Sequence, residues 1–181
     1  MRELSLHILD LIENSIRADA SIIAVTIVEK PGQNLLEISV EDNGSGLTVT
    51  SEQALDPFYT TKNGKRTGLG LSLFRAAAEQ AGGAVTIERS SLGGVAVKAT
   101  MRLNDIDRKP LGDLAATLSS VVCTNPHLDV WCRFVTGQGE CVVRVSDVVK
   151  EFCASDRCGL AIARRVSEKI RSGLAAIRSS V

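Results

Sequence analysis

The first helical stretch of the chain, residues 4–20 (LSLHILDLIENSIRADA), combines a mostly apolar composition with one polar stripe. Four polar side chains recur at steps of three, four and three residues, so a helix places them on one face. They are His7, Asp10, Asn14 and Arg17. Burying such groups without partners would cost on the order of several kcal/mol. The stripe therefore lines either a cleft or an ordinary solvated surface, and the helix by itself does not distinguish the two.

The composition bounds the classes of partner. The 181 residues fit one domain, or one domain with a substantial appendage, and 44% hydrophobic with 23% charged residues is ordinary for a globular protein. Lys+Arg and Asp+Glu both total 21, so no net charge favours nucleic acid. Aromatic residues, at 3%, are too few for base-stacking platforms. We expect no nucleic-acid partner, and no membrane insertion because no apolar run is long enough to span a bilayer.

The N-terminus and the cysteines indicate a cytoplasmic protein. The sequence MRELSLHILDLIEN carries acidic residues within its apolar part, which is not typical of a secretory signal. All five cysteines lie in the last third of the chain, and no C-x-x-C pair occurs. Reduced thiols are the simpler interpretation, with a metal or redox role as the alternative.

The hydrophobic pattern predicts alternating helices and strand pairs in the first 103 residues. The predicted elements are a helix over 4–20, strands over 21–28 and 35–40, a surface loop over 48–67, a helix over 68–81 and strands over 84–89 and 95–103. The short turn between the first two strands predicts an antiparallel pair. Thr67 can cap the second helix, which Gly82 and Gly83 close.

This order predicts an α/β (α+β) two-layer sandwich, a mixed sheet covered on one face by helices. Residues 104–110 (NDIDRKP) form the clearest boundary, which divides the chain into residues 1–105 and a small α+β extension, 106–181. The extension is predicted to contain a helix over 111–122, a hairpin of 128–135 with 141–145, and a helix from about residue 156. The last helix has an apolar stripe and a basic face, which docks on the domain, on a partner or on an acidic surface, or is simply solvated.

Glycine-rich motifs follow the first helix in a fixed order. The four segments are DLIENSIRADA (10–20), DNGSGL (42–47), DPFYTTK (56–62) and TGLGLSL (67–73). Each alone is weak, because a tight turn explains a glycine pair. Together they resemble the N-box, first glycine box, phenylalanine box and second glycine box of the GHKL superfamily of gyrase, heat-shock-chaperone, histidine-kinase and MutL ATPases. The resemblance covers residues 4–103 and implies a Bergerat-type ATP-binding fold, with ATP and Mg²⁺ as ligands.

The resemblance implies a role for three acidic or amide side chains. Asp42, at a strand end, would accept a hydrogen bond from the exocyclic amino group of adenine, where guanine presents an acceptor. Asn14 would give its side-chain oxygen to Mg²⁺. Asp10, one helical turn earlier, stands where the family often has a glutamate that orients or deprotonates the attacking water. Aspartate is one methylene shorter, and kinase members often carry an amide there, so hydrolysis and phosphotransfer both stay open.

The resemblance also implies contacts from loops and helix ends. Gly44 and Gly46 would let the backbone approach the base, and the N–H groups that open the second helix would favour the phosphates. Lys62 and Arg66 would contact phosphates or be solvated, and Phe58 would anchor the loop. The full set of implied nucleotide-binding residues is Asn14, Asp42, Gly44, Gly46, Phe58, Lys62, Arg66, Gly68, Leu69, Gly70 and Leu71.

Other positions depart from the family pattern or carry no chemistry. Gly93 and Gly94 match the third glycine box only in part. Val95 stands where the family often has a threonine that supports the adenine pocket, so we expect that side-chain contact to be missing. We interpret Glu13 as an ion-pair partner of Arg17 or a solvated charge. His7 and His127 are interpreted as structural.

The loop between the glycine boxes is short, and DPFYTTK is similar to the histidine-kinase version. Because the chain begins at the N-box helix, we expect a stand-alone ATP-binding domain without a dimerisation helix, a plan that anti-sigma-factor serine kinases share. One hypothesis is an ATPase or phosphotransferase that acts on a separate protein. The alternative is a non-hydrolysing, nucleotide-sensing regulatory module in which ATP–Mg²⁺ orders the 48–67 loop. A homodimer stays open.

Overall fold

The structure, a computed structural model, describes residues 3–46, 69–152 and 158–178. Its elements in chain order are α1 (Leu4–Arg17), β1 (Ile22–Lys30), the 3-10 turn η1 (Pro31–Gln33), β2 (Leu35–Asp42), α3 (Leu69–Gln80), β3 (Ala84–Arg89), β4 (Val95–Arg102), α4 (Leu114–Thr124), β5 (Asp129–Thr136), β6 (Gly139–Arg144), α5 (Val145–Lys150) and α6 (Gly159–Arg178). In this described part, no helix combines the length and apolar character of a membrane span.

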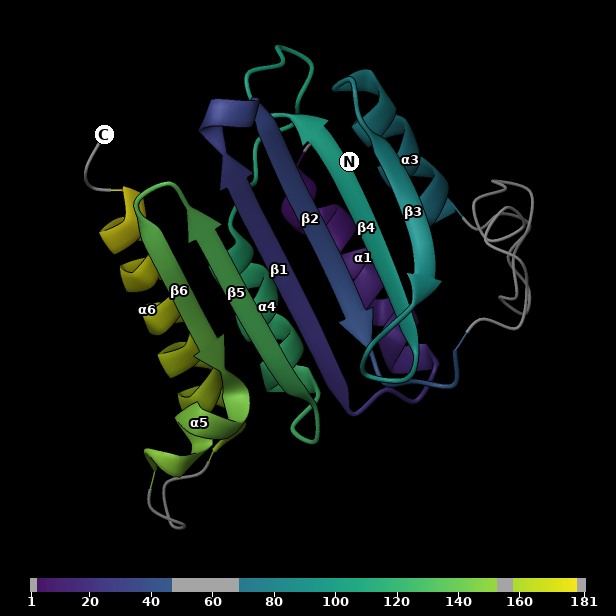
Figure 1. Ribbon diagram of the computed structural model, residues 1–181. Coiled ribbons are helices and arrows are strands. Elements are labelled where there is room, and N and C mark those ends of the chain that lie inside the picture. Colours follow the sequence, from purple (N-terminus) through teal and green to yellow (C-terminus); the bar gives the residue numbers. More distant parts are fainter. Residues whose placement is uncertain (1–2, 47–68, 153–157, 179–181) are drawn as a thin grey trace.

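Six strands form one mixed sheet in the order β3-β4-β2-β1-β5-β6. Neighbouring strands are antiparallel except β1 and β5, which run parallel with Val25 opposite Cys132. Helices α3, α1, α4 and α6 lie side by side over one face of this sheet (Figure 1). The predicted two-layer sandwich and the antiparallel pairing of the first two strands are both confirmed.

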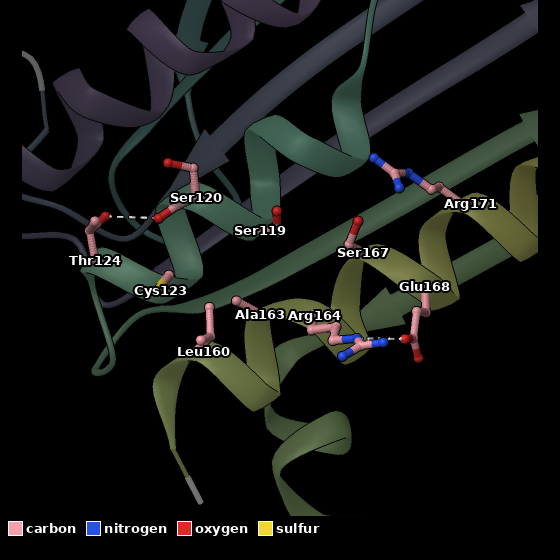
Figure 2. A pocket seen from close by; sticks show the side chains of 10 residues that line it. All are labelled: Ser119, Ser120, Cys123, Thr124, Leu160, Ala163, Arg164, Ser167, Glu168 and Arg171. Atoms are coloured by element: carbon pink, nitrogen blue, oxygen red, sulfur yellow. Dashed lines mark hydrogen bonds and ion pairs between the residues drawn. The ribbon is translucent and has the colours of Figure 1, made fainter.

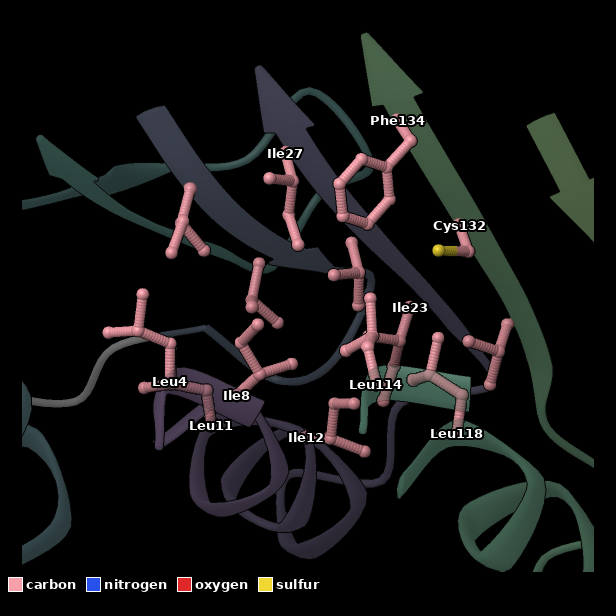
Figure 3. Close-up of a cluster of buried hydrophobic side chains, with 14 of the residues drawn as sticks. Leu4, Ile8, Leu11, Ile12, Ile23, Ile27, Leu114, Leu118, Cys132 and Phe134 are labelled. Carbon is pink, nitrogen blue, oxygen red and sulfur yellow. The ribbon is translucent and has the colours of Figure 1, made fainter. Parts of the chain in front are cut away.

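The core lies between the sheet and its helices, and it draws on both halves of the chain (Figure 3). Alternate residues of β1 and β2, such as Ile23 and Ile38, are buried against α1. Phe134 of β5 and Leu118 of α4 belong to the same cluster, each 1% exposed. Burying side chains of this size contributes roughly 1.5–3 kcal/mol each. The segment after residue 105 therefore extends both the sheet and the core of the preceding residues.

The helix that follows the 104–110 segment begins three residues later than the sequence predicts. Leu4 and Ser5, in the first turn of α1, donate their N–H groups to the carbonyl oxygens of Pro110 and Leu111. These carbonyls satisfy donors that a helix start leaves free, and residues 110 and 111 lie outside the helix. Asp113 then caps α4 by accepting the Ala116 N–H at 2.8 Å.

Helix α6 docks on the rest of the chain through its apolar stripe. Ala163, Val166, Ile170 and Ile177 are buried. Its basic side chains pair with acids of the same chain: Arg165 and Lys169 with Glu151, and Arg171 with Asp113. Among the described residues, the basic face is thus largely neutralised. Arg157 lies outside them.

Candidate functional site

Asp42 ends β2 with a buried carboxylate that accepts hydrogen bonds from three separate elements. Its side chain is 5% exposed. Oδ1 accepts the backbone N–H groups of Gly44 at 2.9 Å and Val95 at 3.2 Å, and Oδ2 accepts the Ser15 hydroxyl at 2.6 Å. These donors compensate the loss of water around a buried charge. Val95 has no side-chain hydroxyl, as the sequence shows, but its backbone supports the carboxylate instead.

Glycines surround Asp42 because the backbone leaves no room for side chains. A Cβ on Gly94 would lie 2.1 Å from Asp42 Oδ1, and one on Gly44 would lie 2.6 Å from the carbonyl oxygen of Ala18. Gly46 has a φ of 81°, which favours glycine. The neighbouring Asn43 joins the end of β2 to the start of β1, since its Oδ1 accepts the N–H groups of Ser21 and Ile22, each at 2.9 Å. The turn thus forms a close-packed cradle at the strand end.

Asp10 lies where α1 meets the start of α3. It is half-buried, and a Cβ on Gly70 would lie 3.0 Å from Asp10 Oδ2. One turn before Asp10 in α1, the His7 ring stacks on Phe74, which lies one turn after Gly70 in α3, and the ring centroids are 5.4 Å apart. The two helices therefore run antiparallel. The structure therefore brings together the N-box and the second glycine box, which are far apart in the sequence.

Asn14 is exposed on the same helix and carries an oxygen of the kind that Mg²⁺ prefers. Its Oδ1 accepts a hydrogen bond from the guanidinium group of Arg17. Arg17 also lies 3.6 Å from the carboxylate of Glu13, so the ion pair predicted for Glu13 is present. The donor set fits a hydrated magnesium ion, because one amide oxygen and a carboxylate one turn away leave most positions to phosphate and water. An amide oxygen has two lone pairs, so a metal at Asn14 would lie close to the Arg17 guanidinium that is bonded to the same oxygen.

Several residues that the sequence predicts to contact the nucleotide lie in the part of the chain that the structure does not describe. Phe58, Lys62, Arg66 and Gly68 lie outside the described residues, and Thr67 does so as well. Leu69 begins α3, and Leu71 is partly buried against the core. The donors Ser15 and Val95 were not predicted to contact Asp42. A backbone N–H has no sequence signature, and Ser15 could have been found only from its place beside Asn14 on a buried helix face.

His7 is buried between α1 and α3, at 1% exposed, so it lies beneath the polar stripe rather than in it. Neither ring nitrogen has a hydrogen-bond partner among the described residues. Burial, followed by the positive charge of Lys109, lowers the pKa of His7 to about 4. A neutral, stacked ring is what a structural role requires.

The buried His7 should make the protein less stable in mild acid. Its pKa is 6.5 without the fold and about 4 within it, so between these values the unfolded chain binds the extra proton. The free energy of unfolding should therefore be highest above pH 6.5 and fall by up to about 3 kcal/mol toward pH 4. The variant His7→Phe keeps a ring against Phe74 but has no group to protonate, so its free energy of unfolding, measured with urea, should separate from that of wild type as the pH falls. The exposed-site control His127→Gln should follow wild type, and parallel curves for His7→Phe would contradict the prediction.

One groove of the molecule lies apart from the predicted site residues. A groove of about 590 Å³ lies between α4 and α6, lined by residues such as Cys123 and Leu160 (Figure 2). Its cations Arg164 and Arg171 pair with Glu168 and Asp113, and none of the predicted site residues lines it. In the described part of the chain, no three His, Cys, Asp or Glu side chains could together hold a metal.

The thiols of the buried Cys132 and the partly buried Cys141 are poor nucleophiles and ligands. Burial, and then the neighbouring Cys141, raises the pKa of Cys132 to about 12, and burial also raises the pKa of Cys141. Both are therefore protonated at neutral pH. Cys123 and Cys158 are exposed and free, and Cys153 lies outside the described residues.

The first part of the chain, which carries this geometry, is similar to known proteins. The model of the family described as "Histidine kinase-, DNA gyrase B-, and HSP90-like ATPase" matches residues 2–105. The sensor protein CitS of Halalkalibacterium halodurans is 36% identical over 63 residues, 34% of this chain and 12% of that protein. The chain thus matches a small part of the length of this curated relative.

Solved structures show the same likeness. The ATP-binding domain of PrrB from Mycobacterium tuberculosis is 25% identical, with a TM-score of 0.43, over 54% of this chain and 64% of that chain. The catalytic domain of histidine kinase ThkA is 26% identical, with a TM-score of 0.46, over 57% and 68%. The Aquifex aeolicus MutL ATPase domain complexed with ADP is 16% identical, with a TM-score of 0.43, over 75% and 60%.

Proposed function

Because the chain belongs to the histidine kinase-, DNA gyrase B- and HSP90-like ATPase family, we propose that it binds ATP with Mg²⁺ around Asp42 and Asn14 and acts as an ATPase or phosphotransferase on a separate protein. The observation that carries the proposal is the Asp42 carboxylate, buried at a strand end within a cradle of glycines. Among the described residues its Oδ2 accepts one hydrogen bond, so the carboxylate keeps acceptor capacity for a ligand at the end of the strand.

Asp42 suits adenine and not guanine. An ionised carboxylate only accepts hydrogen bonds, and the exocyclic amino group of adenine donates one. Guanine would place its carbonyl oxygen against the carboxylate, leaving two buried acceptors without a donor. Sites built to hydrogen-bond one substrate group can therefore discriminate strongly against a nucleotide that leaves two buried acceptors facing each other. Nucleotide choice would thus be decided at the end of β2.

The phosphate side of the site would be formed by α1 and the start of α3. Asn14 would hold Mg²⁺, which when bound bridges phosphate oxygens and neutralises charge on them. The N–H groups of the first turn of α3 would favour the phosphates. Asp10, facing Gly70 at this junction, would take the proton of the attacking group at its carboxylate, whether that group is water or a hydroxyl or imidazole of a partner.

Melting temperatures test adenine recognition. ATP–Mg²⁺ at about 100 times its Kd should stabilise the fold by about 2.7 kcal/mol, a rise of several degrees, whereas GTP–Mg²⁺ at the same concentration should leave it unchanged. Asp42→Asn is the matched variant: the two N–H donors at Oδ1 would hold the amide oxygen there, so the NH2 group would face the base and the response to ATP should be lost. Equal stabilisation of the wild-type chain by ATP and GTP would contradict the role of Asp42.

A nucleotide-sensing module without turnover is the second candidate function. One observation favours it: the Arg17 guanidinium is bonded to the oxygen of Asn14 that would bind the metal, so a bound Mg²⁺ would repel this cation and favour a rearrangement of the surface. Purification of the chain with its partner in ATP–Mg²⁺, followed by transfer of labelled γ-phosphate, separates the candidates. Label on the partner or released phosphate supports the enzyme, and bound, intact ATP supports the sensor.

A further inference from the structure

Ser15 and Asp42 join the end of α1 to the end of β2 inside the protein. Both are 5% exposed, and Ser15 Oγ lies 2.6 Å from Asp42 Oδ2. Ser15 follows Asn14 in the sequence, but a helix turns by about 100° per residue. Asn14 is therefore exposed on the phosphate side, whereas Ser15 points into the interior. Adjacent residues thus face two different parts of the site.

The Ser15 hydroxyl has one proton and two acceptors within reach. The carbonyl oxygen of Leu11 lies 3.3 Å from Oγ, and Asp42 Oδ2 lies closer, at 2.6 Å. Hydrogen bonds from a hydroxyl to a carboxylate are short and about twice as strong as those between neutral groups. The proton therefore goes to Asp42, and Ser15 is the donor to Oδ2.

The two oxygens of Asp42 differ in what they can still accept. Oδ1 already accepts two backbone N–H groups, from Gly44 and Val95. Among the described residues, Oδ2 accepts only the Ser15 hydroxyl, so one of its two lone-pair positions is left for a ligand. A donor at one lone pair sets the rotation of the carboxylate and hence the direction of the other. Ser15 therefore acts together with the two N–H groups at Oδ1 to fix where the open acceptor points.

On the basis of the proposed function, we infer that Ser15 is a positioning residue for adenine. Its hydroxyl holds the Asp42 carboxylate so that Oδ2 faces the exocyclic amino group of the base. Ser15 is on a different face of α1 from Asp10 and Asn14, so contacts with the phosphates do not depend on it. Loss of Ser15 should then weaken recognition of the amino group while the rest of the nucleotide still binds.

The test compares ATP with purine riboside triphosphate, which differs only in lacking the exocyclic amino group. By calorimetry in Mg²⁺, wild type should bind ATP roughly 10- to 100-fold more tightly, the scale of a hydrogen bond to a charged group. In Ser15→Ala this ratio should fall to about threefold or less. Such a fall would show that the Ser15 hydroxyl and the amino group of the base are energetically coupled. Ser15→Thr keeps a hydroxyl and should keep the wild-type ratio. Ser15→Cys replaces the hydroxyl with a thiol of similar size that is only a weak donor, so it should also lower the ratio. This variant takes the place of Ser15→Ala if the alanine variant does not fold.

Ser5→Ala is the matched control. Ser5 is also buried on α1, at 1% exposed, and its hydroxyl bonds a carboxylate, that of Glu3, about 15 Å along the helix from Ser15. This variant should keep the ratio. If Ser15→Ala and Ser15→Cys weaken both nucleotides equally, Ser15 is merely structural and the inference is overturned. If wild type binds neither nucleotide, the proposed function fails and the role of Ser15 fails with it.

Discussion

Replacing Gly94 with alanine should reduce ATP affinity by about 100-fold or more, because it disrupts a site whose discrimination depends on placed hydrogen bonds. The added Cβ would lie 2.1 Å from Asp42 Oδ1 and 2.6 Å from the Gly44 nitrogen. Neither neighbour can move freely, since these two atoms are hydrogen-bonded to each other at 2.9 Å. The carboxylate would have to rotate out of the position that suits adenine. Calorimetric titration with ATP–Mg²⁺ measures the effect.

Gly32→Ala is the matched control for this substitution. Gly32 lies in the turn between β1 and β2, where a Cβ would meet nothing within 4 Å. It should bind ATP like wild type. The Gly94→Ala protein should also be destabilised by about 1–3 kcal/mol, the usual cost of overpacking, so binding is measured well below its melting temperature. Wild-type affinity in a folded Gly94→Ala protein would show that Asp42 does not contact the nucleotide.

Asp10→Asn should lower the turnover of ATP by about 10²–10⁴-fold, the usual contribution of a general base. The amide has nearly the same shape beside Gly70 but cannot accept the proton. ATP affinity should change little, since the proposed nucleotide contacts lie on other residues. The measurement is release or transfer of γ-phosphate at saturating ATP–Mg²⁺.

Glu79→Gln provides the control for Asp10→Asn. Glu79 is an exposed carboxylate on α3 that pairs with Arg75 at 2.7 Å, so its loss should leave turnover unchanged. If Asp10→Asn turns over ATP like wild type, Asp10 has no part in the chemistry. In that case the proton would have to pass to another group or directly to water.

The sequence was most informative where the chemistry is local. Periodicity and turn residues predicted α1 and the β1–β2 pair, and the motif at the end of β2 singled out Asp42. The parallel pairing of β1 with β5 was not predicted, because about a hundred residues separate the two strands and no local pattern records such a contact. The same holds for the donors to Asp42. Ser15 and the Val95 N–H come from segments that meet only in the fold.

The predicted roles of the phosphate-side residues stay predictions, because they rest on what α1 and the start of α3 would do with a ligand. The structure does bring Asp10 and Gly70 together, which spacing alone could not establish. It also shows the bond between Arg17 and Asn14, which a helical wheel does not predict, since both side chains could equally have faced water.

The parallel register between β1 and β5 also decides where the sheet ends. Without residues 106–181, β1 would be an edge strand directly beside β2, which carries Asp42. The C-terminal hairpin covers β1, so among the described strands the edge on this side is β6. At about 4.8 Å per strand, that edge lies roughly 14 Å from β2. Exposed edges are where sheets recruit further strands, from other chains or from aggregates. The hairpin therefore moves the edge on this side of the sheet to three strands away from the strand that carries Asp42.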